Sequence, residues 1–409
     1  MLKPVKMYNF DEVINRKNTN SISYEGWKSS YEHLKVDGAF PFGDDYIRMW
    51  VADMDFATPP EIIEAIKERL DKKILGYTQI FDSKYYETLE KWFLEQYHWE
   101  INTKEIVISP GVVPALLRLV PLLIKPDENI LISTPSYGPF NLAGTYHNRQ
   151  VFNSKLRKNN HRFEMDFADL EQKIKDPSLN IKLFILCNPH NPTGSVWTKE
   201  ELYTLGKICL DNNVWIISDE IHCDLLRTGK QHIPLATIFK ETDRIVTCTA
   251  PSKTFNLAGS LMSNIFIKNE SVRKQYQETY HEVLSPLNIA ATQAAYSKCL
   301  PWLEALKQYL DANFQLLETI LLKELPHAKF SIPEATYLAW IDISYYIKNL
   351  PNKHKLTEFF IKNAGVVVED ENKFVNHSAG FIRLNIACSQ AVLIEGLNKI
   401  TNSLKTINQ

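Results

Sequence analysis

The stretch Val214-Trp215-Ile216-Ile217-Ser218-Asp219-Glu220 is a continuous apolar run that ends in two carboxylates. Similar runs, separated by helical patterns, lie at Ile106–Ser109, Asn129–Ser133, Lys182–Cys187, Ile245–Cys248 and Ile265–Ile267. Because hydrophobic residues do not alternate with polar ones, these runs are typical of strands covered on both faces. The helical stretches between them predict βαβ crossovers, and hence an α/β fold with a mostly parallel sheet.

The rest of the chain predicts a second, smaller unit. A polar, turn-rich N-terminal region is followed by an expected helix over Pro59–Leu70, which Thr58 can cap and which has Ile62, Ile63, Ile66 and Leu70 on one face. Helical and strand-like patterns typical of an α+β domain follow at Ala290–Leu300, Trp302–Leu325, Thr336–Asp342 and Phe381–Ile386. We therefore expect an N-terminal arm and part of the small domain over residues 1–58, a large domain over 59–288 and a C-terminal small domain over 289–409.

Composition and charge are those of an ordinary globular protein. The 409 residues are 44% hydrophobic and 23% charged, with a formal net charge of −2. This charge gives no reason to expect nucleic acid or an anionic membrane as a partner. The sequence shows no apolar signal core, and no run approaches the roughly 18 apolar residues of a membrane span. We expect a cytoplasmic protein.

The cysteines and histidines predict neither disulfides nor a metal site. The six cysteines form no Cys-x-x-Cys pair and show no pairing with histidine at metal-binding spacing. In a chain of this length they are expected to be buried free thiols in a reducing cytosol, with disulfides in a secreted protein as the alternative. The histidines, His190 and His222 among them, lack the His-Glu-x-x-His spacing, so we expect no metal.

Candidate site residues stand after five of the predicted strands. In parallel sheets, ligands gather at the carboxyl ends of the strands. The residues found there, in chain order, are Gly111, Tyr137, Asn191, Asp219 and Lys253. Their coincidence predicts one site at one edge of the sheet.

Three of these side chains suit pyridoxal 5′-phosphate (PLP). Lys253, in Ala250-Pro251-Ser252-Lys253-Thr254-Phe255-Asn256, can carry the PLP aldehyde as a Schiff base. Asp219 can hold a proton on the pyridine nitrogen, and Asn191 can donate a hydrogen bond to the phenolic oxygen. A lysine in such a segment is usually a surface residue, and its place downstream of Asn191 and Asp219 is what favours catalysis.

Asp219 and Asn191 also have ordinary structural interpretations. Asp219 could cap a helix that begins at Ile221, as Asp often does. A carboxylate at the end of an apolar strand is nevertheless costly to bury without a cation, which a protonated pyridine would supply. Asn191 lies in Asn188-Pro189-His190-Asn191-Pro192-Thr193-Gly194, whose Asn-Pro pairs and glycine are also typical of turns.

Other residues could hold the cofactor ring and its phosphate. Tyr137, in Pro135-Ser136-Tyr137-Gly138-Pro139, could stack on the ring or be an ordinary loop aromatic. Backbone N–H groups at a helix start can bind phosphate, and Gly111 precedes a helical pattern, although a single glycine is a weak signal. Ser252 adds a hydroxyl next to Lys253.

Arg383 is an arginine inside the apolar run Phe381-Ile382-Arg383-Leu384-Asn385. It could form a structural ion pair. A buried, fork-shaped cation is also a suitable clamp for the α-carboxylate of an amino acid.

Taken together, these strings resemble the fold-type I PLP enzymes of the aspartate aminotransferase superfamily. The strings that narrow the resemblance to its MalY/PatB branch of cystathionine β-lyases and cysteine C–S lyases are Met49–Pro60, Gly76–Thr78, Gly194–Thr198, Ser218–Leu225, Ala250–Gly259 and Thr336–Asp342. The resemblance covers about residues 20 to 400. It implies the PLP-dependent transferase fold, with residues 59–288 as the PLP-binding domain.

The resemblance also implies roles around the PLP ring. Lys253 would carry the cofactor and shuttle the Cα proton, and Asp219 would pair with the pyridine nitrogen. Asn191 and His222 would lie near the phenolic oxygen, where relatives outside this branch often have Tyr at the position of His222. Tyr137 would stack on the ring.

The phosphate and the substrate would have their own partners in this family. Gly111, Val112, Val113 and Ser252 would hold the phosphate, and Arg383 would bind the substrate carboxylate. Tyr77 would reach the phosphate of the neighbouring subunit, which makes the homodimer obligatory.

Two positions depart from the wider superfamily. Ala250 stands where many aminotransferases carry Ser, and Leu261 stands where many carry a phosphate-binding Arg. We therefore expect phosphate binding to depend more on backbone groups, Ser252 and Tyr77. A typical aspartate aminotransferase becomes less favoured, whereas the branch assignment stands.

Three functions follow in order of preference. The first is a PLP-dependent β-lyase that cleaves L-cystathionine or related cysteine S-conjugates to a thiol, pyruvate and ammonia. The second is an aminotransferase that acts on an L-amino acid with nearly the same side chains. The third is a regulator-binding protein without enzymatic activity, against which the intact set of Lys253, Asp219, Asn191 and Arg383 argues.

Overall fold

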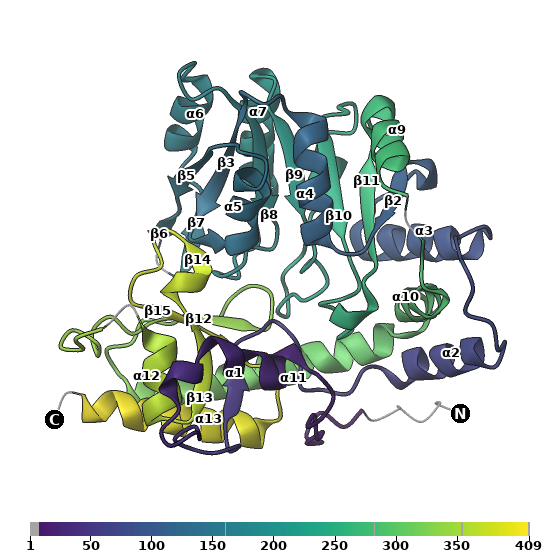
Figure 1. The fold of residues 1–409 in the computed structure, drawn as a ribbon. Coiled ribbons are helices and arrows are strands. Elements are labelled where there is room, and N and C mark those ends of the chain that lie inside the picture. The colour runs from purple at the N-terminus through teal and green to yellow at the C-terminus, as the bar shows by residue number, and fades with distance from the viewer. Residues whose placement is uncertain (1–7, 160, 282, 353–354, 408–409) are drawn as a thin grey trace.

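The computed structural model describes residues 8–159, 161–281, 283–352 and 355–407. Figure 1 shows a large part built around one sheet and a smaller part built around a second sheet. The N-terminal arm lies against the smaller part, next to the C-terminal helix α13 (Gln390–Thr406). Segments from the two ends of the sequence therefore build one layer of the molecule.

The large sheet has the order β2-β11-β10-β9-β8-β3-β5. The bounds of its strands are Ile106–Ser109 (β2), Asn129–Thr134 (β3), Val151–Lys155 (β5), Ile181–Cys187 (β8), Trp215–Asp219 (β9), Ile245–Thr249 (β10) and Ser263–Ile267 (β11). Strands β10, β9, β8, β3 and β5 run parallel to one another. Strand β11 is antiparallel to both of its neighbours, β10 and β2. The predicted α/β class and the six predicted strands are confirmed, and β5 is an additional edge strand.

Helices cover both faces of the large sheet, as its continuously apolar strands predict. Alternate residues point to opposite faces, so Ile130 and Ile132 belong to one buried cluster and Leu131 to the other. One face is covered by α4 (Val112–Leu123), α5 (Gly138–Thr145) and α9 (Glu270–Thr279). The other is covered by α6 (Phe167–Lys175), α7 (Lys199–Asp211) and α8 (Leu235–Ile238).

The small sheet has the order β1-β13-β15-β12. The bounds of its strands are Ile47–Met49 (β1), Leu338–Asp342 (β12), Val366–Asp370 (β13) and Phe381–Asn385 (β15). Strand β1 comes from the N-terminal region and pairs in parallel with β13. The helices of the small part are α1 (Trp27–Ser30), α11 (Leu300–Glu324), α12 (Leu356–Asn363) and α13. The predicted α+β unit is thus completed by the N-terminal arm.

In the sequence, the segment between β1 and β2 carries α2 (Pro60–Leu70) and α3 (Lys84–Tyr97). Helix α10 (Pro286–Lys298) packs against both. The predicted cap of α2 is wrong, because the Thr58 hydroxyl donates to the main-chain oxygen of Asn256 at 3.3 Å and not to the helix. The predicted apolar face of α2 is only partly covered. Ile62 is fully buried, but Ile63 and Leu70 remain 41% and 45% exposed.

The six cysteines are buried free thiols, as predicted. Within the described residues, no helix combines the length and the apolar character needed to cross a membrane.

Candidate active site

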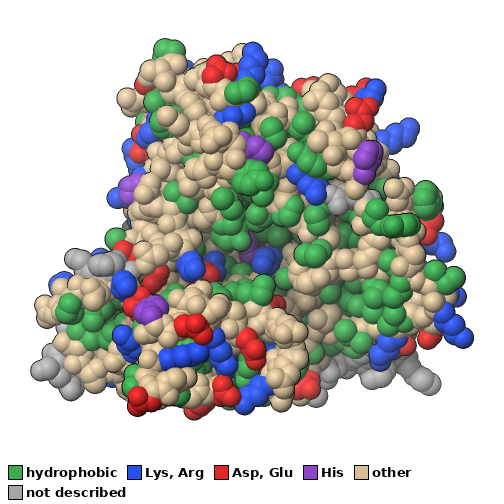
Figure 2. Space-filling model, in the orientation of Figure 1, with side chains coloured by type: hydrophobic (Ala, Val, Ile, Leu, Met, Phe, Trp, Pro, Cys, Tyr) green, Lys and Arg blue, Asp and Glu red, His purple; other side chains and the backbone are tan. Residues whose placement is uncertain are grey.

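The carboxyl ends of the parallel strands meet at the edge of the large sheet that faces the small part. Figure 2 shows a hollow between the two parts, with hydrophobic side chains around it and basic and histidine side chains within it. Among the predicted residues at these strand ends, Asn191 contacts the small sheet and Lys253 contacts the N-terminal arm.

Lys253 lies in the turn that follows β10. Its Nζ atom donates to the main-chain oxygen of Ala52 at 2.8 Å, so the amine faces the N-terminal arm. Burial lowers the pKa of Lys253, and the charge of Arg383 lowers it further. Both effects favour the neutral amine, which is the nucleophilic and basic form.

Asp219 ends β9 and is only 5% exposed. Its Oδ1 atom accepts a hydrogen bond from the Ile221 N–H at 3.1 Å, and among the residues described here no salt bridge to Asp219 is found. Burial raises the pKa of Asp219 to about 7. This carboxylate therefore lacks the cation that would stabilise its charged form.

The alternative in which Asp219 caps a helix is wrong. Residues 221–224 form turns and no helix. After these turns, the chain contacts a distant segment. Leu226 forms an isolated bridge with Ala335, and the Thr336 N–H donates to the main-chain oxygen of Leu225 at 2.7 Å. These contacts with a distant segment prevail over the local helical pattern.

Arg383 and Asn191 join the two parts of the molecule. Arg383 lies on β15 and is 2% exposed. Its Nη1 atom donates to Asn191 Oδ1 at 3.0 Å, and its Nη2 atom donates to the main-chain oxygen of Trp50 at 3.0 Å. Nη2 also forms an ion pair with Glu369. The predicted ion pair is present, and the sequence reasoning did not identify Glu369.

His222 lies beside this group of residues. It is 3% exposed, and its ring meets that of Tyr337 edge-on at 6.4 Å. Its buried Nδ1 atom has no hydrogen-bond partner among the described residues. Burial lowers the pKa of His222 to about 3, helped by the charges of Lys253 and Arg383. The ring is therefore neutral near pH 7 and can both donate and accept a hydrogen bond.

Tyr137 lies in the short strand β4 (Ser136–Tyr137), just before α5. Strand β4 pairs with β14 (Phe374–Val375), which places Tyr137 opposite Phe374 of the small part. Burial raises the pKa of Tyr137, and Arg383, Glu369 and Asp219 are near enough to affect it. Tyr137 therefore lies close to the charged side chains of Arg383, Glu369 and Asp219.

The predicted phosphate-binding residues lie at two strand ends. Gly111 is the N-cap of α4, and Val112 and Val113 form the start of this helix. The first N–H groups of a helix have no partner within it and attract anions. Ser252 lies beside Lys253 in the turn after β10.

Tyr77 is the predicted residue that stands apart. It is 97% exposed and lies between α2 and α3, where the neighbouring Thr78 forms a bridge with Leu284. Ile74, Leu75 and Phe81 are also exposed, by 70%, 60% and 89%. The segment thus presents an apolar surface to solvent.

Side chains from both parts hold the arm across the site. Asn385 Nδ2 donates to the main-chain oxygens of Val51 and Asp53 at 2.7 and 2.6 Å. Asn256 Oδ1 accepts from the Met54 N–H at 3.1 Å. Both asparagines lie within or beside the strings that predicted the site, but their partners are far away in sequence. The sequence alone therefore gave no sign of this role.

Asp224 is a second residue that the sequence reasoning did not identify. Its Oδ2 atom accepts from the hydroxyl of Thr254, next to Lys253, at 2.6 Å. Its Oδ1 atom accepts from Trp92 Nε1 at 3.2 Å and from the Tyr97 hydroxyl. One buried carboxylate thus ties the segment that carries Lys253 to α3.

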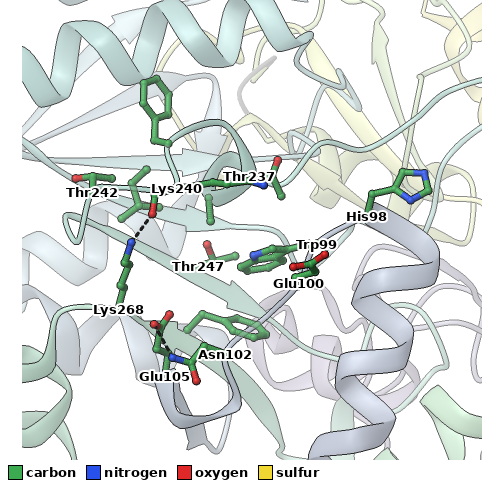
Figure 3. A pocket seen from close by; sticks show the side chains of 14 residues that line it. His98, Trp99, Glu100, Asn102, Glu105, Thr237, Lys240, Thr242, Thr247 and Lys268 are labelled. Atoms are coloured by element: carbon green, nitrogen blue, oxygen red, sulfur yellow. Dashed lines mark hydrogen bonds between the residues drawn. The ribbon is translucent and has the colours of Figure 1, made fainter.

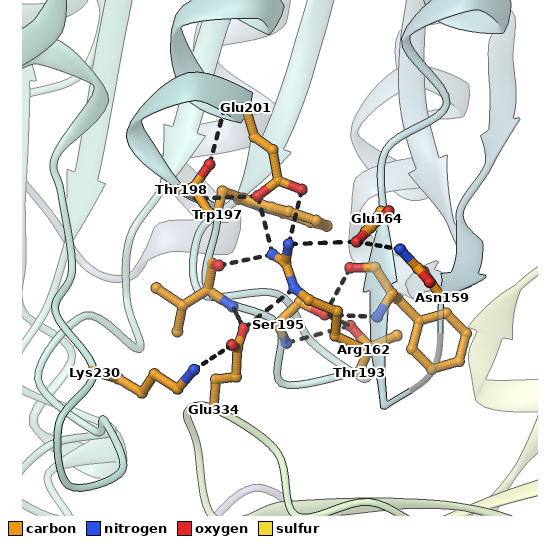
Figure 4. A network of polar contacts seen from close by, with 12 residues as sticks. Asn159, Arg162, Glu164, Thr193, Ser195, Trp197, Thr198, Glu201, Lys230 and Glu334 are labelled. Atoms are coloured by element: carbon orange, nitrogen blue, oxygen red, sulfur yellow. Dashed lines mark hydrogen bonds and ion pairs between the residues drawn. The ribbon is translucent and has the colours of Figure 1, made fainter.

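A polar network fastens the loop that contains Asn191 (Figure 4). Arg162 pairs with Glu201 at 2.9 Å and lies 3.7 Å from Glu334. Glu334 also accepts from the Val196 N–H at 2.9 Å and pairs with Lys230 at 2.7 Å. Nearby, Gly194 has a φ of +69°, and a Cβ atom there would lie 2.3 Å from Pro333. Only glycine fits this position.

The pocket in Figure 3 lies elsewhere. It has a volume of about 270 Å³ and is lined by Ile245, which begins β10, and by Lys268, which follows β11. Lysine 253 follows the opposite end of β10. Two polar side chains that line the pocket are paired with one another, since Asn102 Nδ2 donates to Glu105 Oε1 at 3.0 Å. This pocket contains none of the predicted site residues.

The surroundings of the site fit PLP. Asp219 is a buried carboxylate without a salt bridge in the described structure, and a pyridinium would supply the cation. The unpartnered Nδ1 atom of His222 could bond a polar atom of a ligand. Lys253 favours its neutral form, and the start of α4 suits a phosphate.

Comparisons with known proteins identify the family of the chain. The family model "Aminotransferase class I and II" matches residues 44–400. Cystathionine beta-lyase PatB of Bacillus subtilis (strain 168) is 39% identical over 401 residues, which cover 97% of this chain and 100% of that protein. Protein MalY of Escherichia coli (strain K12) is 30% identical over 407 residues, with 98% and 100% covered.

A solved structure shows the same fold. The crystal structure of a PLP-bound C-S lyase from Staphylococcus hominis superposes with a TM-score of 0.92 and 47% sequence identity, over 97% of this chain and 98% of that one. The chain therefore belongs to the aminotransferase class I and II family, and within it to the branch of PatB and MalY.

Proposed function

We propose that the protein is a PLP-dependent carbon–sulfur β-lyase that cleaves L-cystathionine or related cysteine S-conjugates to a thiol, pyruvate and ammonia. The observation that carries this proposal is the meeting of Lys253, Asn191 and Arg383 at one edge of the sheet, with Lys253 and Arg383 reaching neighbouring residues of the arm. The likeness to PatB and to the Staphylococcus hominis C-S lyase supports the same reaction.

Residues of the large part would hold the cofactor. Lys253 would bind its aldehyde, Asp219 its pyridine nitrogen, and Asn191 and His222 its phenolic oxygen. Tyr137 would lie against the ring. The residues that would hold the phosphate are Gly111, Val112, Val113, Ser252 and, from a second subunit, Tyr77.

When bound, PLP supplies an electron sink for the pair of electrons left when the substrate Cα–H bond breaks. Asp219, whose pKa is raised by burial, would keep a proton between itself and the pyridine nitrogen. Lys253, whose pKa is lowered by burial, would take the proton from Cα as a general base. Arg383 would orient the substrate through its α-carboxylate.

The bond that breaks next is the one between Cβ and sulfur. Thiolate is a much better leaving group than hydroxide, so cysteine derivatives should react faster than serine. The thiolate leaves with the bonding electrons, and hydrolysis of the three-carbon remainder gives pyruvate and ammonia. The arm residues Ala52 and Asp53, held by Lys253 and Asn385, would limit the access of water to the reacting atoms.

We further propose a homodimer in which Tyr77 completes the partner's site. Tyr77 is 97% exposed, and Ile74, Leu75 and Phe81 around it are exposed as well. The exposed Ile63 and Leu70 of α2 lie on the same stretch of chain. Exposed apolar side chains gathered in this way are typical of an interface between proteins.

We also propose that residues 59–288 form the cofactor-binding domain, that residues 1–58 form the N-terminal arm and part of the small domain, and that residues 289–409 form the rest of the small domain. The pairing of β1 with β13 supports this division. The free thiols support a reducing compartment, the cytoplasm.

Omission of the keto-acid acceptor tests the reaction type. Purified protein loaded with PLP is mixed with L-cystathionine, and pyruvate is measured over time. A β-lyase releases pyruvate in large excess over enzyme without any acceptor. An aminotransferase stalls after one turnover and resumes only when a keto acid is added, and that result would replace the lyase proposal.

A further inference from the structure

We infer that Glu369 competes with the substrate carboxylate for the Arg383 guanidinium and thereby sets the KM of the enzyme. This inference rests on the proposed function, in which Arg383 binds the α-carboxylate. It makes Glu369 a residue that tunes substrate binding and takes no part in the chemistry.

Glu369 and Arg383 are brought together by the pairing of two strands of the small sheet. Glu369 lies on β13 and Arg383 on β15, and the two are register partners in an antiparallel pair. Side chains opposite one another in such a pair lie on the same face of the sheet. Their ion pair is largely shielded from water, since the side chains are 14% and 3% exposed. Salt in the solvent therefore weakens it little.

The contacts of Arg383 show where a substrate could bind. Nη1 donates to Asn191 Oδ1, and Nη2 bonds both the main-chain oxygen of Trp50 and the carboxylate of Glu369. Within the described part of the chain, the buried Nε atom has no hydrogen-bond partner. Of these partners only Glu369 is an anion, so it offers the kind of charge-assisted contact that a substrate carboxylate would make.

A second carboxylate at Arg383 meets the negative charge of Glu369. Like charges at short distance in a partly buried site repel one another strongly. The positive charges that act on Glu369 are those of Arg383, Lys373 and Lys253, and Asp370 adds a negative one. Substrate binding therefore includes the cost of loosening the Glu369–Arg383 pair, and this cost raises KM.

Arg383 does not depend on Glu369 for its position. The bonds to Asn191 and to Trp50 hold both terminal nitrogens at 3.0 Å. The guanidinium also lies over the ring of Phe374, with its carbon 5.3 Å from the ring centre. Removal of the charge of Glu369 should therefore leave the clamp in place and free one of its binding sites.

The variant Glu369→Gln tests the inference. It keeps the shape of the side chain and removes its charge. With PLP-loaded enzyme and L-cystathionine, we expect KM to fall about fivefold to tenfold and kcat to change little. The inhibition constant of propionate, a carboxylate without an amine, should fall by a similar factor, whereas uncharged propionamide should show no such change.

Glu371→Gln is the matched control. Glu371 lies two residues away and accepts a hydrogen bond from the Gly380 N–H at 2.9 Å, which a glutamine oxygen can also accept. The substitution removes the same charge from the same segment without touching Arg383. Its KM should equal that of the wild type. An equal fall of KM in both variants would overturn the inference, because general charge and not competition would then be the cause.

The variant Arg383→Lys separates this inference from the proposed function. If Arg383→Lys leaves KM unchanged, the carboxylate clamp is wrong and the inference falls with it. If Arg383→Lys raises KM but Glu369→Gln leaves KM unchanged or raises it, only the inference is overturned. A Glu369 that positions Arg383, and does not compete for it, would give the latter result.

Two further measurements test the inference if Glu369→Gln does not fold or if the wild type is inactive. If Glu369→Gln does not fold, Glu369→Asp withdraws the carboxylate from the guanidinium, and KM should fall by a smaller factor. If the wild type releases no pyruvate, the lyase proposal fails. The competition is then measured as the rise in melting temperature on adding propionate, which should be larger in Glu369→Gln than in wild type. An equal rise in both proteins overturns the inference.

Discussion

The Nη1 atom of Arg383 lies 3.0 Å from Oδ1 of Asn191. This bond links the small sheet to the loop after β8, and it also fixes the orientation of the Asn191 amide. Because the oxygen of the amide faces Arg383, its nitrogen is left to donate elsewhere, as a bond to the phenolic oxygen of the cofactor requires. One side chain thus connects the proposed substrate clamp with the proposed cofactor site.

The variant Asn191→Asp tests this dual role. It keeps the acceptor for Arg383 but replaces the N–H donor with a negatively charged oxygen. We expect kcat/KM to fall by about a hundredfold, comparable to the loss of a single key hydrogen-bond donor in other active sites. The absorption maximum of the bound cofactor should also shift, and an unchanged spectrum would contradict the predicted bond.

The variant Asp219→Asn should lower the activity of the loaded protein and raise the stability of the cofactor-free protein. Without cofactor, burial raises the pKa of Asp219 from 3.8 to about 7 in the folded protein. The folded state then binds the proton more tightly than the unfolded state. Stability is therefore lost as pH rises from about 4 to about 7, by at most about 1.4 kcal/mol per pH unit.

We expect cofactor-free Asp219→Asn to melt several degrees above the wild type at pH 8 and close to it at pH 4.5. The loaded variant should lose at least about a hundredfold in kcat. Thermal melting of cofactor-free protein at the two pH values, with kinetics of the loaded protein, checks both. Equal melting temperatures at pH 8 would show that Asp219 is not destabilising.

The variant Asp224→Ala should destabilise the protein and disturb Lys253. It leaves the buried donors of Trp92, Tyr97 and Thr254 without their acceptor. We expect a loss of roughly 3 kcal/mol or more in the free energy of unfolding. Asp224→Asn keeps one acceptor and should lose less. Urea denaturation of the three proteins measures the order, and a variant Asp224→Ala as stable as wild type would contradict it.

The variant Tyr77→Ala should impair cofactor binding without harming the fold. Tyr77 is 97% exposed within one chain, so its removal should not lower the stability of that chain. We expect PLP to dissociate at least about tenfold faster, in keeping with the loss of a hydrogen bond to a charged group. Tyr146→Ala, which alters a side chain that is 68% exposed, is the control and should retain PLP.

Mixed dimers give a second test of the shared site. A dimer of one Tyr77→Ala chain and one Lys253→Ala chain contains one site with both native residues. Under PLP-limiting conditions, in which Tyr77→Ala homodimers lose their cofactor and Lys253→Ala homodimers cannot react, random reassembly of the two variants should restore about a quarter of the wild-type activity. No recovery, with dimers present in ultracentrifugation, would place Tyr77 in its own subunit's site or in none.

The large sheet was predictable because its strands are short, continuously apolar and separated by helical patterns. Strand β5, Val-Phe-Asn-Ser-Lys over Val151–Lys155, was not, because it is an edge strand with three polar residues. Strand β1 was missed because its pairing with β13 joins segments more than 300 residues apart. Propensity carries no information on such contacts.

The residues that follow strands were predictable as a group, because strand direction alone brings them to one edge. Glu369 was not, since a glutamate in an apolar strand gives no hint that Arg383 stands opposite it. Asp224 lies in the stretch Ser218–Leu225, but its role was not predictable, because its partners lie on α3 and beside Lys253. The sequence indicates which chemistry a residue can do, but distant pairing decides which residues support it.

The proposed β-lyase reaction and the role of Lys253 are tested together by one measurement. It is pyruvate release from L-cystathionine by PLP-loaded wild type and Lys253→Ala, without added keto acid. Lys253→Ala should keep the fold, because the described contacts of the Lys253 side chain include one hydrogen bond, to the main-chain oxygen of Ala52. We expect sustained pyruvate from the wild type and none from Lys253→Ala. Pyruvate from both proteins at equal rates, or from neither with L-cystathionine and with S-methyl-L-cysteine, would contradict it.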